Sequence, residues 1–299
     1  MSEKGENLNK AKELKNDEFY TTREAVEAEL KHYKDQFKDK TIFCPCDSGE
    51  SEFVKFLLDK FQDWGLKKLI WACNRSKLVL SYDGSYRFSI LEKNHDCFSD
   101  TSKEIMKNSD IIVTNPPFSL FRAFLQQIHD IGVKYLIIGS LNALSYTVIF
   151  NKFKDGELWL GYKTGTQVFK VPESVKNAFE ENGQLFVRLG NICWYTNLEN
   201  TVQDKELKLS DEYPEFEQYD NYPEAVEIPK VTQIPKGLRG QAGVPITFLT
   251  KFCPKQFKII GKSDQLAGPI ETDGVYQSKP GRFYLNGKRL YERIVIEAV

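Results

Sequence analysis

The chain has 299 residues, a formal net charge of -1 and a mean hydropathy of -0.45. This length suits one large domain or a domain with a smaller appendage. The balanced charge gives no overall signal for nucleic-acid binding, so any surface that binds a polyanion must be local. No long uncharged apolar run is present, so we expect no membrane partner.

The N-terminal stretch and the cysteines indicate a cytoplasmic protein. Residues 1–15 are charged and lack the apolar core of a signal peptide, and we expect them to be flexible. The six cysteines contain no Cys-x-x-Cys pair and the three histidines do not cluster with them, which favours reduced thiols over disulfides or a zinc site. Cys44 and Cys46 are the one close pair, and simple burial is favoured over metal binding there. We therefore expect no metal.

The first regular element expected is an amphipathic helix over Arg23–Phe37. Its apolar residues recur at helical spacing, and Thr22 is a suitable N-cap. Two interpretations of the preceding Phe19 and Tyr20 remain open. They could fix this helix to the body of the protein, or the segment Asp17–Thr22 could close over a cofactor.

Residues 41–51 combine an apolar strand with a turn of small residues, and a helix is expected over 52–61. A strand, a turn and a helix in this order form the first half of a nucleotide-binding βα unit. Backbone amides at such a turn can bind a carboxylate, and Asp47 could accept from an ammonium group. This pair suits the amino-acid end of S-adenosylmethionine. The turn is not Gly-x-Gly-x-x-Gly, which disfavours a dehydrogenase.

Two further strands are expected, one over 68–74 and one over Tyr86–Leu91, the second with the alternation of an edge strand. Asn74 could hydrogen-bond a ribose diol, although a carboxylate is the stronger partner there. Asp96 and Phe98 follow the second strand, where an acid and an aromatic ring could bracket an adenine ring. A solvated turn is the alternative for Asp96.

The stretch Asp110–Thr114 predicts a buried strand that stops abruptly at Asn115-Pro116-Pro117-Phe118, because the prolines cannot donate ladder hydrogen bonds. Asn115 can present its side-chain oxygen as an acceptor, the Pro-Pro geometry fixes the Pro116 carbonyl, and Phe118 offers an aromatic face. Two acceptors and one stacking surface suit an exocyclic amino group on a planar ring, whereas a plain turn after a core strand is the alternative. The tetrapeptide resembles the catalytic motif of amino-group methyltransferases that use S-adenosylmethionine.

Strands and helices then alternate, with helices expected over Leu120–Ile131 and Asn142–Phe153 and a strand over Val133–Gly139 between them. This alternation predicts an α/β fold with a parallel sheet and helices on both faces. Functional sites in such sheets lie at the carboxyl ends of the strands. The polar residues named above fall at those ends, which predicts that they meet there.

The pattern becomes β-rich toward residue 198, and a hairpin turn is expected at Leu189–Asn191. The composition changes near Glu199 toward charge, tyrosine and proline. We therefore place the boundary between a domain over 16–198 and a smaller region over 199–299.

The C-terminal region contains a basic, glycine-rich loop and a basic hairpin with an Asn286-Gly287 turn. The basic residues of the loop and the hairpin are Lys236, Arg239, Lys288 and Arg289, and Arg282 and Arg293 flank the hairpin. Basic residues on a two-stranded ribbon could follow a phosphate backbone. For the loop, an ordinary surface loop is an equal alternative.

Taken together, five stretches resemble the EcoRI-type family of adenine-specific DNA methyltransferases. They are Asp17–Thr21, Leu30–Tyr33, Cys44–Asp47, Asn115–Phe118 and Gly243–Leu249. The order of cofactor turn, catalytic tetrapeptide and recognition region is similar to the γ class of amino methyltransferases. The resemblance implies a Rossmann-like methyltransferase domain over 16–198 and a target-recognition region over 199–299.

The resemblance also implies roles for single residues. Those that would line the methionine end of S-adenosylmethionine are Tyr20, Thr21, Pro45, Cys46 and Asp47. Asp96 and Phe98 would contact its adenine, with Asn74 at the ribose. Asn115 and Pro116 would hold the amine of an adenine extruded from duplex DNA, and Phe118 would stack on that base. Pro117 completes the catalytic tetrapeptide.

The expected function is site-specific methylation of adenine N6 in double-stranded DNA by a bacterial or phage-encoded enzyme. A monomer is expected, and a cognate restriction endonuclease would be a partner in function only. Two alternatives remain open. One is a related methyltransferase acting on RNA bases or protein glutamine, and the other is a non-catalytic nucleic-acid-binding relative.

Overall fold

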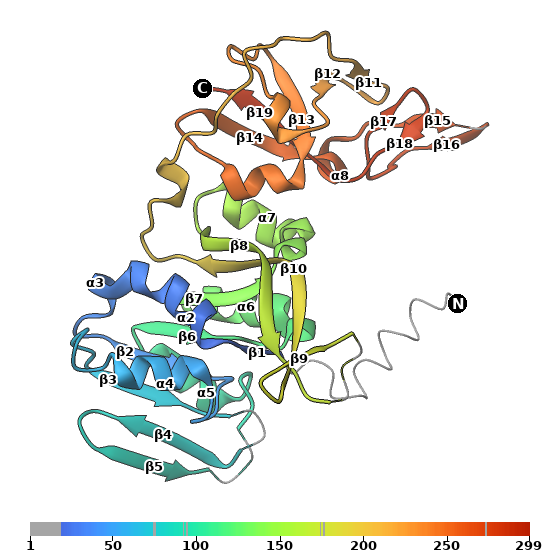
Figure 1. Cartoon of the computed structure of the whole chain (residues 1–299). Coiled ribbons are helices and arrows are strands. Elements are labelled where there is room, and N and C mark those ends of the chain that lie inside the picture. The colour runs from blue at the N-terminus through green and yellow to red at the C-terminus, as the bar shows by residue number, and fades with distance from the viewer. Residues whose placement is uncertain are drawn as a thin grey trace. The chain divides into compact units, whose positions relative to one another are not determined.

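The computed structural model describes residues 19–73, 76–91, 93, 95–173, 175, 177–272 and 274–299. The chain, drawn in Figure 1, forms two compact units, Met1–Asn200 and Thr201–Val299. The predicted flexible segment and Asn74 lie outside the described residues. No helix within the described ranges is long and apolar enough to cross a membrane.

A ten-stranded sheet forms the centre of the first unit, in the order β1-β8-β10-β7-β6-β2-β3-β4-β5 with β9 paired to β10 (Figure 1). Its strands are β1 (Tyr20–Thr21), β2 (Thr41–Cys44), β3 (Lys68–Trp71), β4 (Leu78–Tyr82), β5 (Tyr86–Ile90), β6 (Ile111–Thr114), β7 (Lys134–Ser140), β8 (Trp159–Lys170), β9 (Phe179–Glu181) and β10 (Gln184–Thr196). β3, β2, β6 and β7 are parallel neighbours, whereas β10 runs antiparallel to β7, and β4 to β3. The predicted α/β class is confirmed, but the sheet is mixed rather than parallel throughout.

Helices cover both faces of this sheet. They are α2 (Arg23–Leu30), α3 (Lys34–Phe37), α4 (Glu52–Asp59), α5 (Asp100–Lys107), α6 (Phe121–Ile131) and α7 (Thr147–Lys154). Side chains of α2 and α4 form one buried cluster with Val113 and Leu136 of the sheet. On the opposite face, the Phe121 ring of α6 packs on Tyr195 at 5.0 Å between centroids and fills the space beside Gly139. A strand buried on both faces needs apolar side chains in both directions, which explains the run Ile111–Val113.

Local sequence sets the helix ends. The Thr22 hydroxyl accepts from the backbone N–H of Ala25 at 3.4 Å, and the Ser51 hydroxyl accepts from that of Phe53 at 3.2 Å, so both are N-caps. Gly132 ends α6 in the left-handed conformation, with φ 77°. The single helix predicted over 23–37 is wrong in one respect, because a 3₁₀ turn over Lys31–Tyr33 interrupts it.

The predicted hairpin at Leu189–Asn191 is wrong. β10 continues through this segment as one strand and pairs with β8 on both sides of it, with a register shift between Leu189 and Ile192. Asn191 has a φ of 56°, a conformation that asparagine adopts more readily than most residues. The extra residue is therefore a β-bulge within a long strand, and the local turn signal marked the bulge.

The far edge of the sheet contains a strand that the sequence did not reveal. β4 pairs with β3 and β5 in an antiparallel hairpin, and β5 forms the edge with every residue exposed. The alternating pattern of Tyr86–Leu91 correctly predicted an edge strand. β4 was missed because Leu78–Tyr82 lacks a clear alternation of apolar and polar residues.

The second unit is built on a five-stranded sheet in the order β11-β12-β13-β19-β14. Its strands are β11 (Gln218–Tyr219), β12 (Tyr222–Glu227), β13 (Gln241–Pro245), β14 (Phe257–Lys262) and β19 (Arg293–Ala298). Two hairpins accompany this sheet, β15 (Ile270–Thr272) with β16 (Val275–Gln277), and β17 (Tyr284–Leu285) with β18 (Lys288–Arg289). The second hairpin turns at Asn286 and Gly287, with φ values of 51° and 73°, so the predicted hairpin is confirmed.

Candidate functional site

The turn after β2 and the end of β6 are tied together through Asp47. Its carboxylate accepts from the Ser51 hydroxyl at 2.6 Å and from the Thr114 hydroxyl at 2.5 Å. The Thr114 oxygen also accepts from the backbone N–H of Cys46 at 3.3 Å. Two segments 67 residues apart in the sequence are therefore fixed against each other at the carboxyl ends of neighbouring parallel strands.

Asp47 is a buried carboxylate without a cation beside it. Only 5% of its surface is exposed, and no Lys, Arg or His of the described residues lies within ion-pair distance of it. Burial raises the pKa of the Asp47 carboxyl from 3.8 to about 6, against hydrogen bonds from Ser51, Thr114 and the Asn115 backbone that lower it. The site thus offers a negative charge near neutral pH and can receive a cationic ligand group.

Asn115 leaves β6 with its amide held in one orientation. Its Nδ2 donates to the backbone carbonyl of Phe19 at 2.6 Å. Its Oδ1 is buried and has no hydrogen-bond partner. An unpaired buried acceptor costs about 1–3 kcal/mol. This oxygen is therefore a candidate acceptor for a ligand donor, and Asn115 stands at the corner where Pro116 and Pro117 end the strand.

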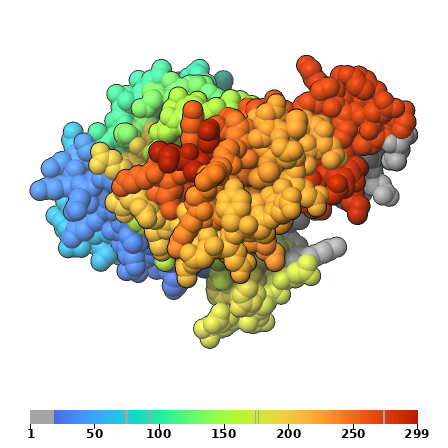
Figure 2. All heavy atoms as spheres, turned by 90° about the horizontal axis from the view of Figure 1, so that it is seen from above, coloured from blue at the N-terminus to red at the C-terminus, as the bar shows by residue number. Residues whose placement is uncertain are grey.

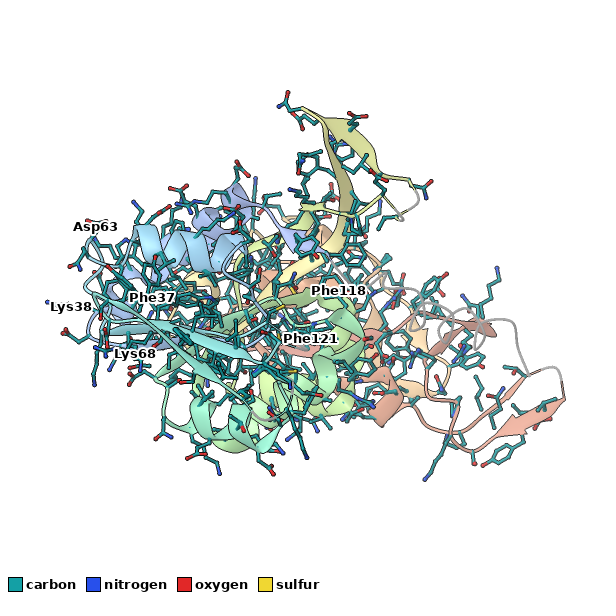
Figure 3. The ribbon with its side chains drawn as sticks, turned by 90° about the horizontal axis from the view of Figure 1, so that it is seen from below. Phe37, Lys38, Asp63, Lys68, Phe118 and Phe121 are labelled. Carbon is teal, nitrogen blue, oxygen red and sulfur yellow. The ribbon has the colours of Figure 1, made fainter. Side chains whose placement is uncertain are left out.

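Phe118 belongs to an aromatic group of three rings with Phe19 and Phe169. The rings of Phe118 and Phe19 stack with centroids 5.6 Å apart and planes at 21°. Phe169 meets both edge-on, at 6.2 Å from Phe118 and 6.1 Å from Phe19. Phe118, labelled in Figure 3, is half-buried, and in this conformation Phe19 covers one of its faces. Phe169 was not predicted as a site residue, and Phe19 was considered only as part of the segment that could close over a cofactor.

Strand β1 contains the predicted Tyr20 and Thr21 and lies beside the aromatic group, since it pairs with the part of β8 that contains Phe169. Tyr20 pairs with Lys170 and Thr21 with Phe169 in antiparallel register. Thr21 is buried, and its hydroxyl oxygen has no hydrogen-bond partner, whereas Tyr20 is half exposed. The segment is therefore fixed to the body of the protein through β8, as the first interpretation predicted, and Phe19 also contacts Asn115; closure over a cofactor stays a prediction.

The segment after β5 lies against the first turn. A hydrogen bond between the Cys46 and Cys97 thiols, together with burial, holds the pKa of Cys46 well above its usual range, so this thiol stays neutral. Between these cysteines and α6, the Cys97 carbonyl accepts from Gln127 at 2.7 Å. Asp96 is exposed and accepts from the backbone N–H of Phe98 at 2.8 Å, an Asx turn. The turn predicted as the alternative is present, and it adjoins Cys46.

One polar group near the aromatic rings was missed. Gln167 lies on the same side of β8 as Phe169, two residues away, and pairs in register with Leu189. Both side-chain amide atoms of Gln167 are buried and have no partner. No sequence signal identified it, because a glutamine within a strand is ordinarily an exposed residue.

The four predicted DNA-contacting residues, Lys236, Arg239, Lys288 and Arg289, are all exposed in the second unit. Lys236 forms an ion pair with Asp211 at 2.5 Å, so its charge is partly neutralised. Among the residues that the structure describes, no hydrogen bond or ion pair joins the loop of Lys236 to the β17–β18 hairpin. They are separate basic elements.

Two flanking arginines have structural roles instead. Arg293 donates to the buried Glu227 carboxylate at 2.8–3.0 Å, and Glu227 also accepts from the Tyr219 hydroxyl. Arg282 pairs with Glu292 at 3.1 Å. Their charges are therefore used within the unit, which separates them from Lys288 and Arg289.

A mixed sheet whose parallel strands end at a buried Asp47 and an Asn-Pro-Pro-Phe corner, with helices on both faces, is the architecture of a Rossmann-like methyltransferase. The family model of the adenine-specific methyltransferase EcoRI matches residues 7–87 and 85–298. The chain belongs to this family, and the predicted resemblance is confirmed.

Three relatives give the same assignment. Type II methyltransferase M.EcoRI of Escherichia coli is 37% identical over 97% of this chain and 95% of its own length. Type II methyltransferases M.MgeORF184P of Mycoplasma genitalium and M.MpnI of Mycoplasma pneumoniae are 35% and 36% identical, each over 97% of this chain. These matches cover 98% and 97% of the two relatives. No solved structure matches the chain.

Proposed function

We propose that the protein transfers a methyl group from S-adenosylmethionine to N6 of an adenine in double-stranded DNA. The observation that carries this proposal is the Asn115 amide, which is oriented through Phe19, keeps a buried, unpaired oxygen and directly precedes Pro116 in the sequence. An exocyclic amine supplies the donors that such a corner lacks. The family assignment supports adenine as the base.

The residues around the first turn fit the proposed cofactor. Asp47 is a buried carboxylate that lacks a cation, and the amino group of S-adenosylmethionine would supply one. Thr21, with its unpaired hydroxyl oxygen, and the adjoining Tyr20 would complete this end of the site, together with Pro45 and Cys46. Asp96 and Phe98 would lie along the adenine, and Asn74 along the ribose. When bound, the cofactor supplies a methyl group on a sulfonium.

The reaction depends on how the chain holds the target amine. The nitrogen lone pair of adenine N6 is conjugated into the ring, so the amine is a weak nucleophile. Acceptance of its two hydrogens by Asn115 Oδ1 and the Pro116 carbonyl draws the nitrogen toward tetrahedral geometry and localises the lone pair. Pro117 makes the corner rigid, and the ring of Phe118 holds the base plane. Orientation is the main source of rate.

The division of the chain suggests a division of labour. Residues 16–198 would form the catalytic domain, and residues 199–299 would recognise DNA through phosphate contacts from Lys236, Arg239, Lys288 and Arg289. The target adenine must leave the duplex to reach Asn115, which costs a few kcal/mol. A restriction endonuclease that cuts the same sequence would be a partner in function, and the protein would act as a monomer.

The test is methyl transfer from radiolabelled S-adenosylmethionine to duplex DNA from a methylation-free host, with RNA and protein as parallel substrates. We expect labelled N6-methyladenine in DNA alone. Transfer only to RNA or to protein would assign the site to another substrate, and no binding of the cofactor in calorimetry would leave a non-catalytic relative.

The first variant to test is Asn115→Ala. Removal of one oriented polar group at a reacting centre typically costs 10²–10³ in rate, so we expect about a hundredfold loss or more with cofactor binding retained. Asn108→Ala is the matched control, since Asn108 is exposed at the end of α5, before β6 begins. Undiminished methylation by Asn115→Ala would remove the mechanism from consideration.

A further inference from the structure

The ring of Phe19 lies where the proposed function needs a flat substrate ring. It stacks on Phe118 of the catalytic tetrapeptide with centroids 5.6 Å apart and planes at 21°, the offset geometry that aromatic pairs prefer. A base stacked on that face of Phe118 would overlap this ring. Phe19 and the target base therefore compete for the same face.

The backbone of the same residue orients a second side chain that the base needs. The Phe19 carbonyl accepts from Asn115 Nδ2 at 2.6 Å, and Asn115 Oδ1 is closed off from solvent. Phe19 therefore contacts two members of the tetrapeptide, Phe118 through its ring and Asn115 through its carbonyl.

Phe19 has room to move. The strand that follows it, β1, pairs with β8 over only two residues, Tyr20 and Thr21. A cavity of about 560 Å³ lies beside the ring, far larger than a phenyl group. It is lined by Phe19, Val175, Asn177, Phe179, Val187, Arg188 and Leu189.

Three of the lining residues, Phe179, Val187 and Arg188, belong to the β9 arm, which is β9 with the first part of β10 (Phe179–Arg188). The arm stands out from the body of the first unit in yellow-green in Figures 2 and 3. The Arg188 guanidinium lies 4.1 Å from the centroid of the Phe179 ring and, among the described residues, has no carboxylate within ion-pair distance. The cavity therefore has an apolar wall for a displaced phenyl ring and a cation at its rim.

We propose that Phe19 is a placeholder for the target base. In the free protein its ring stacks on Phe118 and keeps the corner dry, and an extruded adenine displaces it toward the cavity beside the β9 arm. The stack of Phe19 on Phe118 is then exchanged for a stack of adenine on Phe118, so this face of the Phe118 ring is covered both before and after the base enters. This inference rests on the proposed function and concerns the way in which the base enters that site.

The test compares wild-type protein and Phe19→Ala on two duplexes that carry the sequence methylated in the experiment above. One duplex has adenine at the target position, and the other has an abasic site there. S-Adenosylhomocysteine is present throughout, so no methyl transfer occurs. Only the adenine duplex requires the Phe19 ring to move.

We expect Phe19→Ala to bind the adenine duplex about fivefold more tightly than wild type, the equivalent of about 1 kcal/mol for a lost ring stack. Affinity for the abasic duplex should be unchanged. 2-Aminopurine placed at the target should fluoresce more strongly with the variant, because a larger fraction of the base is extruded. Phe19→Leu, which keeps apolar volume without a flat ring, should fall between the two proteins.

Three outcomes would overturn the inference. Equal affinity changes on both duplexes would make Phe19 a purely structural residue, and no change on either would give it no role. Weaker binding of the adenine duplex alone would make Phe19 a partner of the bound base.

Phe88→Ala, which truncates a phenylalanine 70% exposed on β5, is the control and should match wild type. If wild-type protein methylates no DNA, the proposed function fails first, and that result is separate from these.

Discussion

The two units hold their candidate functional side chains in different ways. In the first unit, Asp47 and Asn115 are each fixed by hydrogen bonds to segments far away in the sequence. In the second unit, Lys288 and Arg289 lie on a short hairpin and are exposed to solvent. The first arrangement is rigid before any ligand arrives, and the second can adapt to one.

This difference matches two kinds of task. Chemistry at a weakly nucleophilic amine requires atoms held within narrow limits, so the supporting contacts must be buried and numerous. Contacts to a phosphate backbone act mainly through charge and tolerate small displacements. A change in the first unit should therefore have a large effect on one step, whereas a change in the second should have a small effect spread over DNA binding.

The largest effect after that of Asn115 is expected at Asp47. Asp47→Asn removes the charge that would pair with the cofactor ammonium, and charge-assisted hydrogen bonds contribute about 1.5–3 kcal/mol. We therefore expect about a tenfold to 150-fold loss of S-adenosylmethionine affinity at pH 7, measured by calorimetry. Asp63→Asn, at an exposed position, should have no effect.

The proposed pairing of Asp47 with the cofactor ammonium group predicts that cofactor affinity falls as the pH is lowered. Because burial raises the pKa of Asp47 to about 6, the carboxyl is mostly ionised at pH 7 and mostly protonated at pH 5. Only the ionised form pairs with an ammonium, so wild-type affinity should fall about tenfold between pH 7 and pH 5. Asp47→Asn should lack this fall. An affinity that is flat with pH in the wild type would contradict the assignment of Asp47 to the cofactor.

A smaller effect is expected at Thr114, which joins Asp47 to the end of β6. Thr114→Val keeps the shape but removes the donor to Asp47, which is buried, and the acceptor for the Cys46 N–H, which is partly buried. Leaving such groups unpaired costs about 1–3 kcal/mol. We expect a loss of that size in the free energy of unfolding by denaturant titration, and about a tenfold weaker cofactor affinity. Thr114→Ser, which keeps the hydroxyl, should restore both. If Thr114→Val kept full affinity, the rigidity assigned to the first unit would be wrong at this point.

The sequence predicted the parts of this site that depend on local backbone chemistry. A β-branched run closed by Asn-Pro-Pro defines a strand end, and a strand followed by a small-residue turn defines the position of Asp47. Because carboxyl ends of parallel strands meet at one edge of a sheet, their proximity followed from the order of elements. The hydrogen bond from the Thr114 hydroxyl to Asp47 joins the two strand ends directly, as this order predicts.

The parts that the sequence did not reveal depend on contacts between distant segments. Phe169 and Gln167 lie near Phe19 only because β8 pairs with β1 and β10, and nothing in their neighbourhood in the sequence indicates this. The bulge at Asn191 was mistaken for a turn, since an αL residue serves both purposes. The 3₁₀ turn that interrupts the first helix was also missed, because the apolar residues there keep helical spacing.

The smallest effects are expected in the second unit. Lys288→Ala and Arg289→Ala should each weaken DNA binding only a few-fold at moderate salt, and each should reduce the slope of log affinity against log salt by about 0.9. Cofactor affinity should stay unchanged in both. Lys67→Ala is the control and should leave the slope unaltered. Lys67 directly precedes β3, so it lies at the amino ends of the parallel strands, whereas the candidate site lies at their carboxyl ends. A large, salt-independent loss with Lys288→Ala or Arg289→Ala would show that the hairpin reads bases with fixed geometry, and the contrast between a rigid first unit and an adaptable second one would then fail.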